Sequence, residues 1–140
     1  MIPEKLQQII TEFEQLETDE EKFEVLMEYG EKLKPIKSNE KNNSNLVQGC
    51  MSIVYITAKI KNDKIFFEGE ADSLLIKGLV QILIEGINEI RTKEFLEMKE
   101  DFLKIFGLTN SLTSSRANAS KNIFLKMKEQ VRKEINNNTN

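Results

Sequence analysis

Two stretches near the start of the chain place apolar side chains at the spacing of an amphipathic helix. The first stretch follows Pro3, a residue suited to a first helical turn. The second begins where Thr18 and Glu21 have the spacing of a capping box, and it stops at Pro35. The two apolar stripes consist of Leu6, Ile9, Ile10, Phe13 and Leu16 in the first stretch and of Phe23, Leu26, Met27, Gly30 and Leu33 in the second. The pattern predicts two consecutive helices within a segment, 1–36, that carries many more acids than bases.

The period of the pattern changes to two after a polar segment, 37–45, that predicts an exposed loop. Alternating apolar residues then indicate strands, and Asn62 with Asp63 suits a two-residue hairpin turn because both residues tolerate positive φ. The predicted strands are 45–48, 52–60 and 65–70. Links this short join only antiparallel neighbours, so the sequence predicts a three-stranded antiparallel meander.

Helical periodicity returns after the predicted strands. Asp72 or Ser73 is a suitable N-cap for an apolar helix that runs to about Ile90 and covers the sheet. The remaining predicted elements are one or two short helices over 92–106 that end at Gly107, a polar link over 109–115, a last helix over 116–135 and a frayed tail over 136–140. Helices before and after one block of strands indicate a two-layer α+β class, with the whole chain, 1–140, as a single domain.

The composition then excludes many kinds of chemistry. The 140 residues include no His, no Trp and one Cys, which is Cys50. Without an imidazole there is no Ser-His-Asp triad, no Cys–His pair and no His-ligated metal centre. A single thiol cannot close an intrachain disulfide or alone fill a Cys-rich zinc or iron–sulfur site. Thiol chemistry at Cys50 would therefore have to be completed by another molecule.

The charge and the hydropathy of the chain argue against nucleic acids and membranes as partners. The chain has 20 basic and 23 acidic residues, a net charge of −3, whereas a general nucleic-acid binder would present a strongly basic face. No apolar run has the roughly 18 residues of a membrane-spanning helix, and the first residues resemble neither a signal peptide nor a transit segment. We therefore expect no nucleic acid, no membrane and a cytoplasmic location, where a lone thiol stays reduced.

Cys50 follows Gly49 at the junction of the first two predicted strands, and Gly49 can adopt a backbone conformation that other residues resist. A lone cysteine is often a small, buried hydrophobe. A side chain in a connection at the edge of a sheet is more often presented than packed. On the residues alone, the structural and the reactive interpretations of Cys50 both stay open.

Three segments resemble, in order and spacing, motifs of the SufE-type sulfur-acceptor proteins, the SufE/CsdE family. The family patterns are N-x-V-x-G-C-x-S-x-V-W, F-x-G-x-S-D-A…I-V-x-G-L and L-T-x-S-R-x-N. The matching segments are NLVQGCMSIVY at 45–55, FEGEADSLLIKGL at 67–79 and LTSSRAN at 112–118. The chain departs from the family at Tyr55, where Trp is usual, at Met51, where Gln is common, and at Ala119–Ser120, where Gly-Leu often follows.

The resemblance implies a two-layer SufE/NifU-like fold and a function in iron–sulfur cluster assembly. Cys50 would accept persulfide sulfur from a SufS-like, pyridoxal-phosphate-dependent cysteine desulfurase, and the protein would stimulate that enzyme. The sulfur would then pass to a SufBCD-like iron–sulfur scaffold. The protein would be an accessory carrier rather than an enzyme, and it would need no cofactor because the pyridoxal phosphate belongs to the desulfurase. Gly49, Ser52, Asp72 and Arg116 would support the cysteine loop, and a homodimer is an open possibility.

Other interpretations remain open for these residues. Asp72 is either an ordinary N-cap or a residue that holds the cysteine loop or contacts the desulfurase. Arg116 is either a structural anchor or a residue that stabilises a partner surface or a thiolate. For the whole protein, one alternative is an interaction module in which Cys50 is structural and the acidic helices bind a basic partner. Another is a peroxidase with a single cysteine, which would require a markedly lowered thiol pKa.

Overall fold

A computed structural model describes residues 1–49, 52–106 and 114–138, with backbone alone at 114–118 and 138. Its first elements are α1 (Glu4–Glu14) and α2 (Asp19–Glu31). The predicted capping box is confirmed, since the Thr18 side chain accepts from the Glu21 backbone N–H and the Glu21 carboxylate accepts from the Thr18 N–H. Both predicted N-terminal helices are therefore present, and α2 ends before Pro35.

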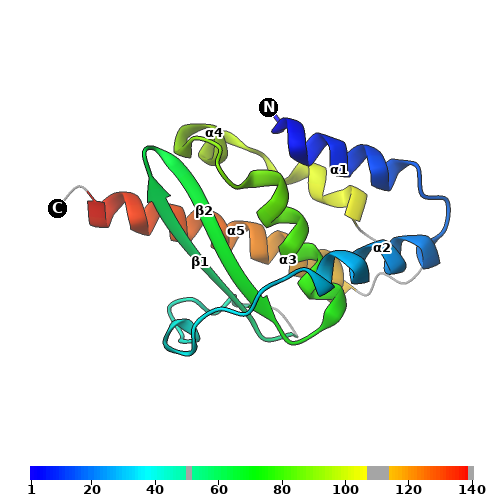
Figure 1. Ribbon diagram of the computed structural model, residues 1–140, viewed down its shortest axis with the longest axis horizontal. Coiled ribbons are helices and arrows are strands. Elements are labelled where there is room, and N and C mark those ends of the chain that lie inside the picture. Colours follow the sequence, from blue (N-terminus) through cyan, green and yellow to red (C-terminus); the bar gives the residue numbers. More distant parts are fainter. Residues whose placement is uncertain (50–51, 107–113, 139–140) are drawn as a thin grey trace.

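The sheet is a single antiparallel hairpin made of β1 (Val54–Lys61) and β2 (Lys64–Ala71) (Figure 1). Asn62 and Asp63 form its turn with φ angles of 53° and 64°. Positive φ at both central positions belongs to the turn type whose twist matches that of the paired strands. The predicted hairpin and its turn are thus confirmed.

The predicted third strand, 45–48, is wrong as a full strand, because the sheet has two strands over the described residues. Leu46 makes one isolated bridge to Tyr55. Two backbone hydrogen bonds flank the bridge, from Val47 N to the Val54 oxygen (2.8 Å) and from Ile56 N to the Asn45 oxygen (2.9 Å). Turns on both sides of this segment prevent further pairing, so the meander is shortened to a hairpin with one bridged neighbour.

The later helices follow the predicted order with shifted ends. They are α3 (Leu74–Ile87), α4 (Thr92–Glu97), the 3₁₀ segment η2 (Glu100–Phe106) and α5 (Ser114–Asn138); a short 3₁₀ turn, η1 (Ser38–Glu40), lies in the predicted polar loop. The helix α3 ends before the predicted Ile90, because Asn88 is extended and Glu89 has a φ of 73°. The helix α5 includes 136–138, which lie in the predicted frayed tail. The predicted stop at Gly107 lies outside the described residues.

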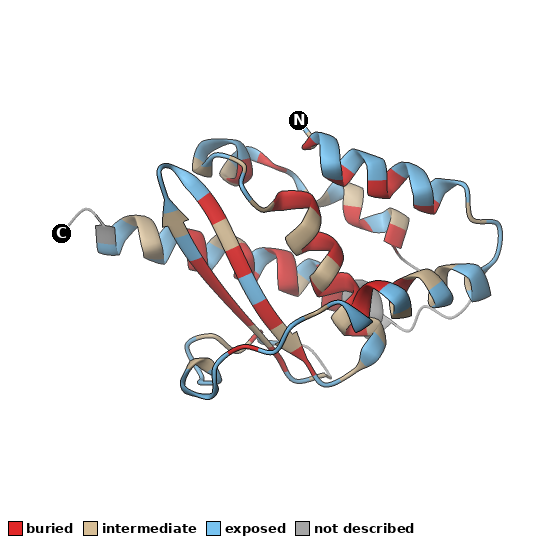
Figure 2. Cartoon of the chain, viewed as in Figure 1, coloured by how far each residue is buried: buried red, intermediate tan, exposed pale blue. Residues whose placement is uncertain are grey.

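The core forms where α3 packs against β2 and the two N-terminal helices, while α5 packs against β1 (Figure 1). Burial alternates along β2, as expected for a strand with one covered face (Figure 2). The rings of Phe67, Phe95 and Phe124 join the sheet, α4 and α5 through edge-to-face contacts with centroids 5.3 and 5.6 Å apart. The α+β class with helices on a small antiparallel sheet is therefore confirmed.

One glycine lets α2 and α3 approach closely. A Cβ on Gly78 would overlap the carbonyl oxygen of Leu26, an atom of the α2 backbone that cannot move aside independently. The two helices are thus in backbone contact at this point, and Gly78 permits it together with Gly30 of α2, whose Cβ would lie 2.5 Å from the Leu74 oxygen of α3. This contact fixes the position of α3 relative to α2.

Candidate functional site

The two described stretches on either side of Cys50 are joined to each other. The hydrogen bond from Val47 N to the Val54 oxygen links the residues that flank the segment 48–53, which is called the cysteine loop below. Cys50 and Met51 lie outside the described residues, so the geometry of the candidate site is defined by its flanks. Ser52, the predicted loop residue after them, is half-buried.

On the N-terminal flank, Gly49 has a φ of +80°, a conformation that residues with a side chain rarely adopt. Its carbonyl oxygen accepts a hydrogen bond of 3.1 Å from Nδ2 of Asn122 on α5. A Cβ on Gly49 would lie 2.7 Å from the same Nδ2 atom. The special backbone conformation predicted for Gly49 is confirmed, and its supporting role in the site stays a prediction.

On the C-terminal flank, Asp72 holds Ile53 through two hydrogen bonds. The Asp72 Oδ1 atom accepts from Ile53 N at 3.0 Å, and the Asp72 N–H donates to the Ile53 oxygen at 3.2 Å. Ser73, not Asp72, is the N-cap residue of α3, although its side chain makes no capping hydrogen bond. The carboxylate of Asp72 is thereby directed at the cysteine loop rather than at its own helix.

Arg116, the remaining predicted site residue, lies in the first turn of α5. Its side chain lies outside the described part of the chain, so both roles predicted for it stay predictions. The same helix carries Asn122 further along. At 1.5 Å of rise per residue, the two residues are about 9 Å apart along the helix axis.

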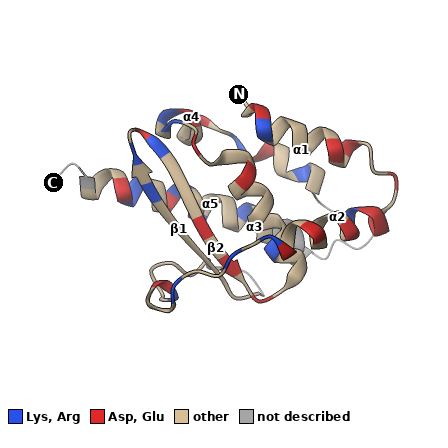
Figure 3. Cartoon of the chain, in the orientation of Figure 1, with Lys and Arg blue, Asp and Glu red and all other residues tan. Residues whose placement is uncertain are grey.

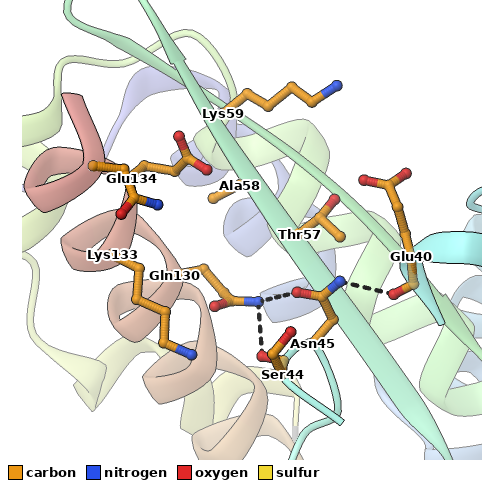
Figure 4. Close-up of a pocket in the computed structure, with 10 residues that line it drawn as sticks. Glu40, Ser44, Asn45, Thr57, Ala58, Lys59, Gln130, Lys133 and Glu134 are labelled. Atoms are coloured by element: carbon orange, nitrogen blue, oxygen red, sulfur yellow. Dashed lines mark hydrogen bonds between the residues drawn. The ribbon is translucent and has the colours of Figure 1, made fainter. Parts of the chain in front are cut away.

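A residue that the sequence analysis missed, Gln130, connects α5 to the strand and to the segment before Cys50. Its Nε2 atom lies 2.6 Å from the Ile56 oxygen and 2.8 Å from Oδ1 of Asn45. It also reaches the Ser44 oxygen at 3.4 Å, and Asn45 in turn donates to the Glu40 oxygen (Figure 4). Gln130 is 5% exposed, so these bonds compensate for burying its amide. A polar side chain at an inward position of an apolar helix face was the signal that could have revealed it.

The cleft at this place has a volume of about 250 Å³ and is lined by residues of β1, α5 and the polar loop (Figure 4). Lys59 and Lys133 lie at the cleft together with Glu40 and Glu134, so the formal charges of these four side chains cancel. Its floor is made by Gln130 and Asn45, whose amides are bonded to one another and to the backbone. The hydrogen bonds of these two amides therefore connect α5 to the polar loop.

Glu70 anchors the other part of the polar loop. Its carboxylate is 2.7 Å from Nζ of Lys41 and accepts from Ile36 N at 3.1 Å. The hydrogen bond from Lys41 is the main reason that the pKa of Glu70 lies below its ordinary value. Glu70 pairs with Tyr55 across the sheet, so this anchor lies at the same end of the hairpin as the cysteine loop.

The acidic residues of the N-terminal segment recur along α1 and α2 (Figure 3). Three of them, Asp19, Glu20 and Glu21, occupy the first turn of α2, where the helix dipole favours negative charge. Some of this acidity therefore has a local structural reason.

Among the described residues, no group of three or more His, Cys, Asp and Glu side chains could hold a metal ion. Within the same residues, no helix is both long enough and apolar enough to cross a membrane.

Curated relatives match a little over half of the chain. An uncharacterized SufE-like protein of Synechocystis sp. is 41% identical over 87 residues, which are 62% of this chain and 55% of that protein. The cysteine desulfuration protein SufE of Wigglesworthia glossinidia brevipalpis is 39% identical over 75 residues, 53% of this chain and 52% of that protein. The chain thus spans about half the length of these two relatives.

A solved structure matches nearly the whole fold. The solution structure of a hypothetical protein from Thermus thermophilus superposes with a TM-score of 0.79, covering 97% of this chain and 99% of that one at 24% identity. The family model described as "SufE: Fe-S metabolism associated domain" matches residues 7–131, which include the cysteine loop and both of its anchors, Asp72 and Asn122. The chain therefore belongs to the SufE family of iron–sulfur metabolism.

Proposed function

We propose that this protein is a sulfur carrier in which Cys50 accepts persulfide sulfur from a SufS-like cysteine desulfurase. The protein stimulates that enzyme and delivers the sulfur to a SufBCD-like scaffold. One observation carries the proposal: the only thiol of the chain lies inside the cysteine loop, 48–53, within the region that matches the SufE family. Cys50 is the acceptor, and Gly49, Ser52, Asp72 and Arg116 support its loop.

The transfer is a thiol exchange that needs no external oxidant or reductant. The Cys50 thiolate attacks the terminal sulfur of the persulfide on the desulfurase. A sulfur–sulfur bond to Cys50 forms while the bond to the desulfurase cysteine breaks, and that cysteine leaves as a thiolate. The proton of the Cys50 thiol passes to solvent or to a base of the desulfurase. A second exchange moves the sulfur to a thiolate of the scaffold.

Apolar side chains around the loop support docking of a protein partner there. Among the described residues, the exposed large apolar side chains are Met1, Ile53, Leu74 and Leu125. Ile53 is bonded to Asp72, Leu74 begins α3 just after Asp72, and Leu125 lies one helical turn beyond Asn122. Exposed apolar residues beside a reactive segment are suited to contact a protein partner. The pyridoxal phosphate stays with the desulfurase in this scheme.

The test is a mass measurement after sulfur loading. The protein is incubated with a SufS-type cysteine desulfurase and L-cysteine, then analysed intact and as the peptide that contains Cys50. The expected result is the gain of one sulfur atom, removable by a reducing thiol. Because the chain has one cysteine, the added mass identifies the site without ambiguity.

Cys50→Ser and Cys50→Ala are the matched controls, and neither should gain sulfur or stimulate the desulfurase. Stimulation that survives in Cys50→Ala, together with a wild-type thiol that stays unloaded, would contradict the proposal and favour an interaction module. A sulfenic acid at Cys50 after hydrogen peroxide, in a protein that accepts no sulfur, would favour a peroxidase instead.

A further inference from the structure

Asn122 is a polar side chain held at a fixed place beside the cysteine loop. It precedes Ile123 and Phe124, which are 0% and 1% exposed and lock this turn of α5 into the core. The backbone of Asn122 is therefore as rigid as the core, and only its side-chain torsions are free. The amide at the end of that side chain donates one hydrogen bond, to the carbonyl oxygen of Gly49.

That bond acts on the peptide unit that leads into Cys50. The Gly49 carbonyl and the nitrogen of residue 50 belong to one planar group, which also contains the Cα atom of residue 50. A donor placed on the carbonyl oxygen therefore orients the whole plane. Because the donor comes from a core helix 73 positions away in the sequence, it ties the carbonyl group of Gly49 to α5.

The Asn122 amide lies so close to Gly49 that a side chain on Gly49 would displace it. The φ of +80° turns the Gly49 carbonyl toward α5, and the missing Cβ leaves the space that the Asn122 amide occupies. The positive φ favours glycine at this position, and a Cβ there would lie 2.7 Å from Nδ2 and displace the Asn122 amide from its hydrogen bond. The two residues form one clamp on the N-terminal side of the loop.

We propose that Asn122 is a positioning residue for sulfur acceptance, which orients the peptide unit entering Cys50 through its hydrogen bond to Gly49. This inference rests on the proposed function and adds a residue to it. Exchange between sulfur atoms requires the attacking thiolate to be aligned with the sulfur–sulfur bond of the donor. A loop that is already held in one orientation loses less conformational entropy when a protein-bound persulfide docks on it.

The experiment compares three variants with the wild type. Asn122→Ala removes the donor, and Asn122→Asp removes it while keeping the size and shape of the side chain. Asn137→Ala is the matched control, because it changes the same residue type at an exposed position of the same helix, far from Gly49. Two rates are measured for each: sulfur transfer from a SufS-type desulfurase with L-cysteine, as a function of carrier concentration, and alkylation of Cys50 by iodoacetamide.

For both Asn122 variants we expect a saturating transfer rate roughly two- to tenfold below wild type, the range expected for one hydrogen bond, with an unchanged half-saturation concentration. We expect alkylation to become faster, because a small reagent needs access but no alignment. The midpoint of its pH profile should stay the same in Asn122→Ala, which adds no charge beside the loop. Opposite changes in the two rates distinguish positioning from a change in thiol pKa, which would move both rates together. Asn137→Ala should match the wild type in every measurement.

Unchanged transfer and alkylation rates in both Asn122 variants would overturn this proposal alone, provided that the wild type accepts sulfur. A rise in half-saturation concentration with no change in the saturating rate would also overturn it, because Asn122 would then be a partner contact. If the wild type accepts no sulfur, the proposed function fails and the positioning role in transfer fails with it. The alkylation rates would then show only whether the clamp orders the loop.

A second measurement tests the clamp itself. Gly49→Ala lowers the thermal midpoint Tm in both the wild-type and the Asn122→Ala backgrounds, because its backbone strain remains in each. The fall should be smaller in the Asn122→Ala background, where the Nδ2 atom that the new Cβ meets is absent. Equal falls in the two backgrounds would contradict a coupled Gly49–Asn122 pair.

Discussion

The contact between α2 and α3 and the loop over 48–53 lie near the same end of the hairpin, yet they are stabilised in different ways. At the helix contact, Gly78 brings two backbones together, and its neighbours Leu79 and Val80 are buried in the core. At the loop, the Asp72 carboxylate accepts a hydrogen bond from Ile53 and the Asn122 amide donates one to Gly49, and both of these loop residues are exposed to solvent. Apolar burial dominates the first region, and individual polar contacts dominate the second.

Because of this difference, the helices and the hairpin can stay folded when the contacts of the loop are lost. Burial of apolar surface contributes large energies that are lost only when the core opens. An exposed hydrogen bond contributes about 0.5–1.5 kcal/mol, because water competes for its partners. The contacts of Gly49 and Ile53 can therefore break at a cost far below that of global unfolding.

The largest expected effect comes from the aromatic core. Phe95 is fully buried between the rings of Phe67 and Phe124, so Phe95→Ala should lower the free energy of unfolding by about 3–5 kcal/mol. Denaturant titration measures the loss, with Phe95→Leu as a control that keeps apolar volume and loses less. Below its unfolding transition, the variant should show the wild-type alkylation rate at Cys50. Faster alkylation of the folded variant would show that the packing of the core also controls access to Cys50.

The next effect concerns the helix contact. Gly78→Ala should lower the free energy of unfolding by about 1–3 kcal/mol, because the new methyl group forces the α2 backbone away from α3. The higher helix propensity of alanine offsets part of this cost. Lys77→Ala, at the preceding position of α3, is the control that adds no atoms at the contact. A Gly78→Ala protein as stable as the wild type would show that the two helices separate easily.

A smaller effect is expected on the loop. Asp72→Ala removes the acceptor of the Ile53 N–H, so it should cost about 0.5–1.5 kcal/mol in global stability at most. Its main effect should be roughly two- to tenfold faster alkylation of Cys50 by iodoacetamide, from a more open loop. Asp72→Asn keeps a side-chain oxygen and should remain near the wild-type rate. Equal rates for Asp72→Ala and the wild type would show that this anchor does not order the loop.

The smallest effect concerns Glu70 and its dependence on pH. Because Lys41 lowers the pKa of Glu70 in the folded state, the ionised carboxylate stabilises the protein above the unfolded pKa of about 4.3. This stabilisation, about 0–1 kcal/mol for a partly exposed pair, is lost as the pH falls through the lowered folded pKa. Wild type should therefore exceed Glu70→Gln in stability at pH 7, and the difference should vanish in acid. A difference that stays constant from pH 7 to pH 3 would exclude this ion pair as its cause.

Local features of the chain were predictable because a few neighbouring residues encode them. The capping box at Thr18, the turn at Asn62 and Asp63 and the apolar stripes of the helices each depend on residues within one or two turns. The same holds for the positive φ of Gly49. The single cysteine and its motif likewise identified Cys50 as the candidate site, and the family match includes that position.

The tertiary structure decided the contacts that no local pattern contains. It reduced the segment 45–48 to a single bridge, because turns on both sides leave no further backbone groups to pair. It also directed the Asp72 carboxylate to Ile53, since the register of the hairpin brings these two ends together.

The sequence by itself therefore determined the helices, the hairpin and the position of the one thiol, all of which follow from periodicity and turn chemistry over short distances. Only the tertiary structure placed Asn122 on Gly49 and Gln130 on Ile56. These pairs are 73 and 74 residues apart, and which polar side chain of α5 meets which backbone oxygen depends on how that helix docks on β1. Docking is set by the packing of the whole core, and no short segment of the chain contains that information.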